Sequence, residues 1–225
     1  MADPMSAATL LRILKGEGVA VKAPNAGWTT HERDDETGKP FGPVHGVMIH
    51  HTASHNSFNV VYNGRSDLPG PLAHAYIDKA GVVWMCSSGR ANHAGLGDSD
   101  VLNAVRTESY ATRPPAPNQR NADGNDPFYG FECENLGDGE DPWPNAQRNA
   151  MVKASAAICR LYGWTAKSVI GHLEWTNQKV DPRGFAMSTF RTQVAECLKA
   201  PPGAWPLPKL TVEQRLDRIE DKLGL

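Results

Sequence analysis

The sequence predicts an α/β fold: a single domain with a central mixed β-sheet flanked by helices, plus a short C-terminal helix. Three observations support this fold class. Short apolar runs bounded by Gly and Pro, which are typical of buried strands, occur along most of the chain. Amphipathic segments at helical spacing lie between and after these runs, and such a mixture places helices over a sheet. A chain of 225 residues also has room for one substantial core and a short appendage.

The first predicted element is an amphipathic helix over "ATLLRIL", which Ser6 caps and which carries Leu10, Leu11 and Leu14 on one face. The polar, turn-rich stretch "GWTTHERDDETGKPFGP" that follows predicts a surface loop. We therefore expect residues 1–45 to form an N-terminal helix and loop packed on the main domain.

Six further segments predict the strands of the sheet and the loops between them. "VHGVMIH" predicts a buried strand, and "NVVYNGRSDLPGPL" after it predicts a loop with about a turn of helix. "AHAYIDKAGVVWMC" predicts a hairpin that turns at Gly81, where a positive φ is tolerated. Residues 91–126 are rich in Asn, Asp, Gly and Pro and predict an irregular, functional loop. "FYGFECEN" and "SVIGH" predict two more short strands, the second ending at His172.

The second half of the chain carries the stronger helix patterns. "NAQRNAMVKASAAICRLYGW" has apolar residues at helical spacing and Gly163 as a stop, and "MSTFRTQVAECLKA" predicts a closing helix. Residues 200–209 are a Pro-rich linker that we expect to be extended. Residues 210–225 then predict an amphipathic C-terminal helix. This helix is expected either to self-associate with another copy of the chain or to dock on the domain.

Composition excludes several classes of function. The formal net charge is -2 and no basic run interleaves with aromatic residues, so we expect no nucleic acid partner. No apolar stretch approaches the roughly 18 residues that a membrane span needs, so we expect no membrane insertion. The first residues lack the features of a secretory signal, which predicts synthesis and retention in a cytosol. The four cysteines are dispersed without CxxC spacing and predict buried free thiols.

Two histidines and one aspartate form a candidate metal site. His50 and His172 each follow an apolar run that predicts a strand, and Asp181 lies nine residues after His172. Zinc enzymes hold the ion with about three His or carboxylate ligands and leave one position open. The spacing is compatible with such a site, although isolated histidines are more often structural.

The order of five motifs gives a more specific indication. "IHHTA", "AHAYIDKAGVVW", "GRANHAG", "GFECEN" and "GHLEWTNQKVDP" together resemble the zinc-dependent N-acetylmuramoyl-L-alanine amidases, the fold shared by phage lysozyme-type amidases and peptidoglycan recognition proteins. The resemblance runs from about Gly46 to Leu198, so residues 46–199 are expected to be the zinc amidase catalytic domain. The N-terminal region and "LPGPLAHAYI" further resemble endolysins of phages that infect actinobacteria.

This resemblance implies the ligands and the catalytic groups. His50, His172 and Asp181 match the ligands of Zn2+ in the family. Lys179 matches a residue that faces the substrate carbonyl, where it would stabilise the oxyanion. Glu132 matches the acidic residue of the family's strand motif and would act as general base.

Other residues are expected beside this centre. His51 and His55, which neighbour His50, are expected to be packing and loop residues. Glu134 points the same way as Glu132 from a strand, so it remains the alternative general base. His93 matches a motif that lines the substrate groove.

Two further positions complete the predicted site. Asn92 and His74 are expected to contact substrate. Phage lysozyme-type amidases often carry a catalytic Tyr at the position where this chain has Ala73. The absence of this Tyr favours Glu132 as the general base.

The resemblance implies cleavage of the amide between N-acetylmuramic acid and the L-alanine of the stem peptide. The partner is bacterial peptidoglycan, and the expected role is that of an endolysin, in the host cytoplasm until lysis and then at the cell wall. A cytosolic cell-wall recycling amidase and a non-catalytic peptidoglycan-binding module are the alternatives. The C-terminal helix is expected to allow homo-oligomer formation, which would raise avidity for the wall.

Overall fold

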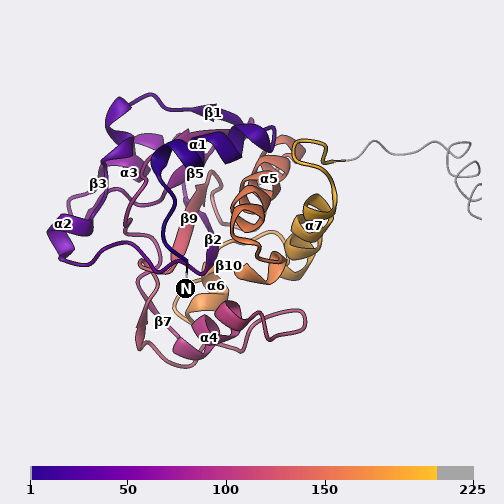
Figure 1. Ribbon diagram of the computed structural model, residues 1–225. Helices are drawn as coiled ribbons and strands as arrows, with labels where there is room; N and C mark the ends of the chain where they lie inside the picture. The colour runs from indigo at the N-terminus through magenta and orange to yellow at the C-terminus, as the bar shows by residue number, and fades with distance from the viewer. Residues whose placement is uncertain (1, 207–225) are drawn as a thin grey trace, which may run out of the picture.

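The computed structural model describes residues 2–206 and confirms the predicted α/β fold with a central mixed sheet (Figure 1). Six strands pair in the order β1-β6-β5-β9-β2-β10. Their bounds are β1 (Ala20–Lys22), β2 (Gly46–His51), β5 (Ala75–Ile77), β6 (Val82–Met85), β9 (Phe128–Cys133) and β10 (Val169–Gly171).

Four neighbouring strands run parallel, and their carboxyl ends therefore lie at one edge of the sheet. β5, β9, β2 and β10 form this parallel part, with Ile49 opposite Gly171 and His50 opposite Glu132. β5 and β6 form the predicted antiparallel hairpin, in which Gly81 has a φ of 80°. β1 pairs in parallel with β6 and forms one edge of the sheet.

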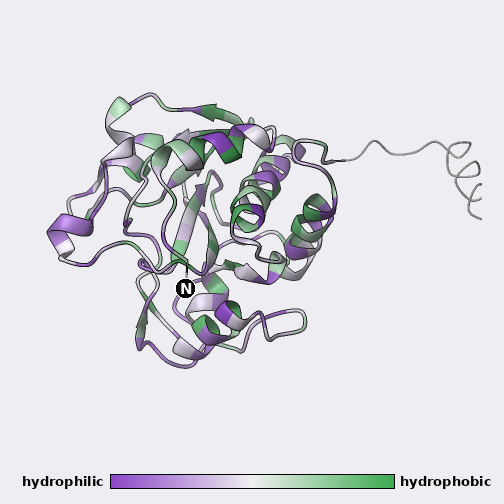
Figure 2. Cartoon of the chain, viewed as in Figure 1, coloured by the Kyte–Doolittle hydropathy of each residue, from purple (hydrophilic) through white to green (hydrophobic). Residues whose placement is uncertain are grey.

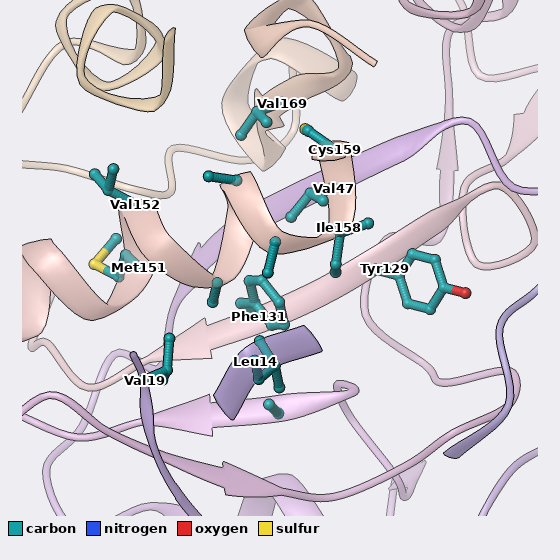
Figure 3. Close-up of a cluster of buried hydrophobic side chains, with 14 of the residues drawn as sticks. Leu14, Val19, Val47, Tyr129, Phe131, Met151, Val152, Ile158, Cys159 and Val169 are labelled. Atoms are coloured by element: carbon teal, nitrogen blue, oxygen red, sulfur yellow. The ribbon is translucent and has the colours of Figure 1, made fainter. Parts of the chain in front are cut away.

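Three helices cover one face of the sheet and enclose the larger core. They are α1 (Ala7–Gly16), α5 (Asn145–Tyr162) and α7 (Met187–Lys199). Figure 3 shows Ile158 of α5 beside Val47 of β2, with Phe131 of β9 and Leu14 of α1 close to them. Figure 2 shows both hydrophobic and hydrophilic residues on α5 and α7, as expected for helices with one face on a core.

The opposite face carries a smaller core and the candidate site. Because side chains alternate along a strand, Met48 and Phe128 point to this face, away from the helices that contact Val47 and Phe131. They pack with Trp175 of α6 (His172–Trp175) and with α4 (Ser99–Thr107). The helix α3 (Phe58–Asn63) contributes Val61 to a separate small cluster. The short elements are η1 (Ala26–Thr29), α2 (Asp34–Thr37), β3 (Gly64–Arg65), β4 (Leu68–Pro69), β7 (Leu96–Gly97), β8 (Ala122–Asp123) and η2 (Ala166–Ser168).

Residues 91–126 differ from the prediction, because they contain a regular helix. The Asp98 side chain caps α4 by accepting a hydrogen bond from the backbone N–H of Asp100 at 2.8 Å. Val101 and Val105 point into the smaller core. The many Asn, Asp, Gly and Pro residues around α4 predict a loop, and the helical spacing of Val101 and Val105 is too short a pattern to outweigh them.

The N-terminal residues are part of the domain. Ser6 caps α1 as predicted by accepting from the Thr9 N–H at 3.3 Å, and Leu10 and Leu14 are buried against α5. All four cysteines are buried and unpaired. Within residues 2–206, no helix is long and apolar enough to cross a membrane. The predicted C-terminal helix, residues 210–225, and the last part of the linker lie outside the described residues.

Candidate metal centre and active site

Three of the predicted site residues converge at the carboxyl ends of β2 and β10. His50 is the last but one residue of β2, and His172 begins α6 directly after β10. His50 Nδ1 lies 3.0 Å from His172 Nδ1 and 3.0 Å from Asp181 Oδ2, and His172 Nδ1 lies 3.1 Å from Asp181 Oδ2. All three side chains are buried. Strand pairing therefore brings together residues that are 122 and 131 positions apart in the sequence.

The chemistry of these three atoms fits a tetrahedral metal ion. His172 Nε2 lies 3.1 Å from the Ala94 carbonyl oxygen, which can only accept, so the proton is on Nε2 and Nδ1 offers a lone pair. Burial, followed by the nearby His172, lowers the pKa of His50 to about 4, which keeps that ring neutral. With metal–ligand bonds of 2.0–2.1 Å, the ligands of a tetrahedral zinc ion lie about 3.3 Å apart. The three donors lie close to this spacing.

The charge of Asp181 suits the same role. Burial by itself would raise its pKa, but the contacts with His172 and His50 hold the pKa of the Asp181 carboxyl below its usual range. Asp181 is therefore a carboxylate at neutral pH. Two imidazoles and one carboxylate form a common ligand set for catalytic zinc.

Glu132 lies beside this triad with a free carboxylate oxygen. It pairs with His50 across the parallel ladder of β2 and β9 and so points to the same face of the sheet. Its Oε2 is buried and has no hydrogen-bond partner among the described residues. Burial, followed by the nearby charge of Asp181, raises the pKa of Glu132 to about 8 against the opposing effect of Lys179.

Glu134, the alternative general base, has very different surroundings. Its Oε2 accepts a hydrogen bond from the Tyr76 hydroxyl at 2.7 Å, and its Oε1 accepts from the Asn56 backbone N–H at 3.0 Å. His55 Nδ1 lies 3.2 Å from the same Oε1. Both oxygens of Glu134 are therefore engaged, Oε1 by the loop after β2 and Oε2 by Tyr76 of β5, whereas Glu132 keeps an oxygen without a partner.

An open cavity of about 360 Å³ extends from these residues across the surface. The polar residues that line it include Glu132, His172, Lys179 and Asp181, and the apolar ones include Val60, Leu68, Leu72 and Val180. Val60, Leu68 and Val180 are large hydrophobic residues with more than a third of their surface exposed. The cavity therefore offers both polar groups and apolar surface to a ligand.

The three residues predicted to contact substrate occupy different places. Asn92 lines the cavity and donates from Nδ2 to the Pro69 carbonyl oxygen at 2.7 Å. His93 also lines it, but its ring lies behind His50, with Nδ1 3.0 Å from His50 Nε2. His74 is completely buried, accepts from the Gly130 N–H at 2.9 Å and does not line the cavity.

Two positions that support the site carry no distinctive sequence signal. Asn125 Oδ1 accepts hydrogen bonds from the backbone N–H groups of His93, Ala94 and Gly95. Gly130 leaves room for the His93 ring, since a Cβ at that position would lie 2.5 Å from it. Asn125 belongs to "DGND", which reads as an ordinary turn, and only the fold shows that its side chain reaches another loop.

His51, the neighbour of His50, lies outside the triad. Its Nδ1 accepts from the Arg183 backbone N–H at 3.2 Å, and its ring packs so closely on Gly137 that a Cβ there would lie 2.2 Å from it. The ring thus packs between two loops, and it also lines the cavity beside the triad.

The sequence model described as N-acetylmuramoyl-L-alanine amidase (Amidase_2) matches residues 40–184, a span that contains the triad, Glu132 and Lys179. The chain belongs to this amidase family. Solved structures share the fold. A variant of PlyL is 12% identical over 81% of this chain and 98% of its own, with a TM-score of 0.51. The PlyG catalytic domain is 12% identical over 86% of this chain and 99% of its own, with a TM-score of 0.50.

A third solved structure has a bacterial source. The endolysin N-acetylmuramoyl-L-alanine amidase LysCS from Clostridium intestinale is 16% identical over 77% of this chain and 94% of its own, with a TM-score of 0.48. No curated protein matches the chain. At 12% identity the PlyL and PlyG structures show the fold of the amidase alone.

Proposed function

We propose that this amidase is a zinc-dependent enzyme that cleaves the amide between N-acetylmuramic acid and the L-alanine of the peptidoglycan stem peptide. The observation that carries the proposal is the convergence of His50, His172 and Asp181, with donor atoms 3.0–3.1 Å apart, at one end of an open cavity. Membership of the amidase family supplies the bond that is cleaved.

The triad residues would hold the ion, and the neighbouring residues would handle protons and charge. Zinc supplies Lewis acidity, which acidifies water and polarises a carbonyl group. Glu132 takes a proton from the attacking water at its free Oε2 and returns it to the departing nitrogen. Lys179, which lines the same cavity, places its ammonium group where it stabilises the negative charge that develops on the carbonyl oxygen.

The pKa of Glu132 suits a group that both accepts and donates a proton. Burial raises this pKa to about 8, and the positive charge of Lys179 opposes the shift. A divalent cation held by the triad would lower it further towards neutrality. A general acid–base group is most effective when its pKa lies near the working pH.

For the biological role we propose an endolysin that stays in the host cytoplasm until lysis and then acts on the cell wall. The resemblance of the N-terminal region and of "LPGPLAHAYI" to endolysins of actinobacterial phages supports this role. A recycling amidase would instead act on soluble wall fragments, and a binding module would hold the wall without cutting it. Self-association through residues 210–225 stays a prediction, which sedimentation of the full chain would test.

The first test is mass spectrometry of purified actinobacterial peptidoglycan after digestion, with and without a zinc chelator. We expect stem peptides that begin at L-alanine, intact glycan strands, and loss of both products when the chelator is present. A parallel digestion of soluble anhydromuropeptides separates the two enzymatic roles, because a recycling amidase prefers them to intact wall. Uncut wall that retains the protein would contradict the enzymatic proposal and favour a binding module.

A further inference from the structure

The Nε2 atoms of His50 and His172, which are not the atoms facing the triad, both lie within hydrogen-bond distance of one short turn, residues 93–95. His50 Nε2 lies 3.0 Å from Nδ1 of His93, and His172 Nε2 lies 3.1 Å from the carbonyl oxygen of Ala94. The partners of the two histidines are therefore consecutive residues, one through its side chain and the other through its backbone.

The proton positions in this arrangement follow from a single backbone group. His93 Nε2 lies 3.0 Å from the Phe128 carbonyl oxygen, which can only accept, so His93 carries its proton on Nε2. The Nδ1 of a neutral His93 is then a bare acceptor. The only proton that fits between the two rings belongs to His50 Nε2, and His50 Nδ1 is left with a lone pair that faces His172 and Asp181.

The surroundings of the His93 ring fix its orientation. The rings of His50 and His93 meet at an interplanar angle of 83°. Gly130 leaves the space that the His93 ring fills, and Asn125 Oδ1 accepts three backbone N–H groups of the turn. The ring therefore has little freedom to rotate away from His50.

We propose that the turn of residues 93–95 is a positioning device in which the His93 ring and the Ala94 carbonyl group fix the tautomers of His50 and His172, so that both Nδ1 lone pairs point at one metal ion. The proposal rests on the proposed function, since it assumes that the triad binds zinc. His93 is on this view a positioning residue that acts through His50. The hydrogen bonds that orient a ligating histidine affect metal affinity by about 10–100-fold.

The decisive comparison is between His93→Asn and His93→Leu, two side chains of nearly equal size and branching. Asn can place an oxygen near the position of Nδ1 and accept from His50, whereas Leu cannot accept, and both lose the hydrogen bond to Phe128. We expect His93→Leu to weaken zinc binding about 10–100-fold in competition with a chromophoric chelator. We expect His93→Asn to recover much of that loss, and circular dichroism checks that each variant is folded.

Two further readouts do not depend on activity. The visible spectrum of the cobalt-substituted protein should change in the Leu variant and return towards the parent spectrum in the Asn variant. Nitrogen NMR of the ¹⁵N-histidine-labelled parent chain should show His50, His93 and His172 all protonated at Nε2, with and without zinc. This measurement needs no variant, so it tests the proposal even if His93→Leu does not fold.

The outcomes separate this proposal from the proposed function. If the parent chain binds no zinc, the proposed function fails, while NMR still reads the tautomers. If the parent binds zinc but the Asn and Leu variants bind it equally well, or lose it equally, the acceptor at residue 93 has no positioning role. A Nδ1-protonated His50 in the metal-free chain would also overturn the proposal.

Discussion

At the scale of single residues, Glu132 and Glu134 show how surroundings separate two identical side chains. They are two positions apart and leave the sheet on the same side. Glu134 accepts hydrogen bonds from Tyr76 and from the Asn56 backbone, so its carboxylate holds a loop. Glu132 has a buried oxygen without a partner among the described residues, beside the triad. This difference favours Glu132 over Glu134 as the proposed general base.

We expect Glu132→Ala to retain zinc and the fold while lowering turnover by about 10²–10⁴-fold, the usual contribution of a general base. The measurement is the initial rate of amide cleavage, together with zinc content and melting temperature. The matched control is Glu134→Ala, which should lower stability by about 1–3 kcal/mol because it leaves buried donors unpaired. Near-full turnover in Glu132→Ala would show that another group is the base.

His74 gives a pH dependence of stability whose sign follows from its burial. Burial lowers its pKa to about 3 in the folded chain, from about 6.5 when exposed. The unfolded chain therefore binds a proton that the folded chain does not, and the free energy of unfolding falls as pH drops from about 6.5 towards 3. The stabilising contribution of neutral His74 is complete above about pH 6.5.

We expect His74→Asn to flatten this dependence, since Asn can still accept from the Gly130 N–H but does not titrate. At pH 5 the parent chain should have lost about 2 kcal/mol through this one group. Urea unfolding of both chains between pH 7 and 4.5, without metal, measures the difference in slope. Parallel slopes in the two chains would contradict the assignment.

At the scale of elements, the strands present the site and the connecting loops complete it. β2 and β9 direct alternate side chains to the helices and to the cavity, which is why Val47 and Phe131 face the core while His50 and Glu132 face the site. The turn of residues 93–95 approaches from the long segment before β9. Its position depends on Asn125, which lies 32 residues after His93 in the sequence.

We expect Asn125→Ala to lower stability by about 1–3 kcal/mol, because three backbone N–H groups of the turn lose their acceptor. The same change should weaken zinc binding, although Asn125 does not belong to the triad. Thermal unfolding and chelator competition measure the two effects. Asn92→Ala is the control, since Asn92 bonds to Pro69 and should leave zinc affinity unchanged. Zinc affinity equal to that of the parent would show that the turn holds its place without Asn125.

At the scale of the whole molecule, the N-terminal segment is part of the catalytic core although the family match begins at residue 40. α1 packs on α5, and β1 extends the sheet beyond β6. Phe41, just inside the family match, contacts His74 and Tyr129. The segment therefore supports the sheet from which the site residues project.

We expect Leu14→Ala to destabilise the whole domain by about 2–5 kcal/mol, because Leu14 is completely buried between α1 and the sheet. Urea unfolding followed by circular dichroism and by zinc release should give coincident transitions. Lys15→Ala, at an exposed position of the same helix, is the control and should change stability by less than about 0.5 kcal/mol. If zinc release were unaffected by Leu14→Ala, the N-terminal segment would be an independent unit.

Sequence patterns alone indicated the fold class, five of the six strands of the central sheet, the helices α1, α5 and α7, and the candidate ligands. Alternation and helical spacing are local properties, so "VHGVMIH" and "NAQRNAMVKASAAICRLYGW" predict β2 and α5 with little ambiguity. The motif order then indicated His50, His172 and Asp181 as ligands, and the tertiary structure brings their donor atoms together.

The neighbours of each polar group could be known only from the three-dimensional fold. In the fold the Glu134 carboxylate is hydrogen-bonded, whereas Glu132 Oε2 has no partner among the described residues. His74 is buried away from the cavity, and His93 lies against His50, 43 positions earlier in the chain. It also revealed α4 inside a segment whose composition predicts a loop. The physical reason is common to these cases: hydrogen bonding and burial depend on atoms from distant segments, and these meet only when the sheet has formed.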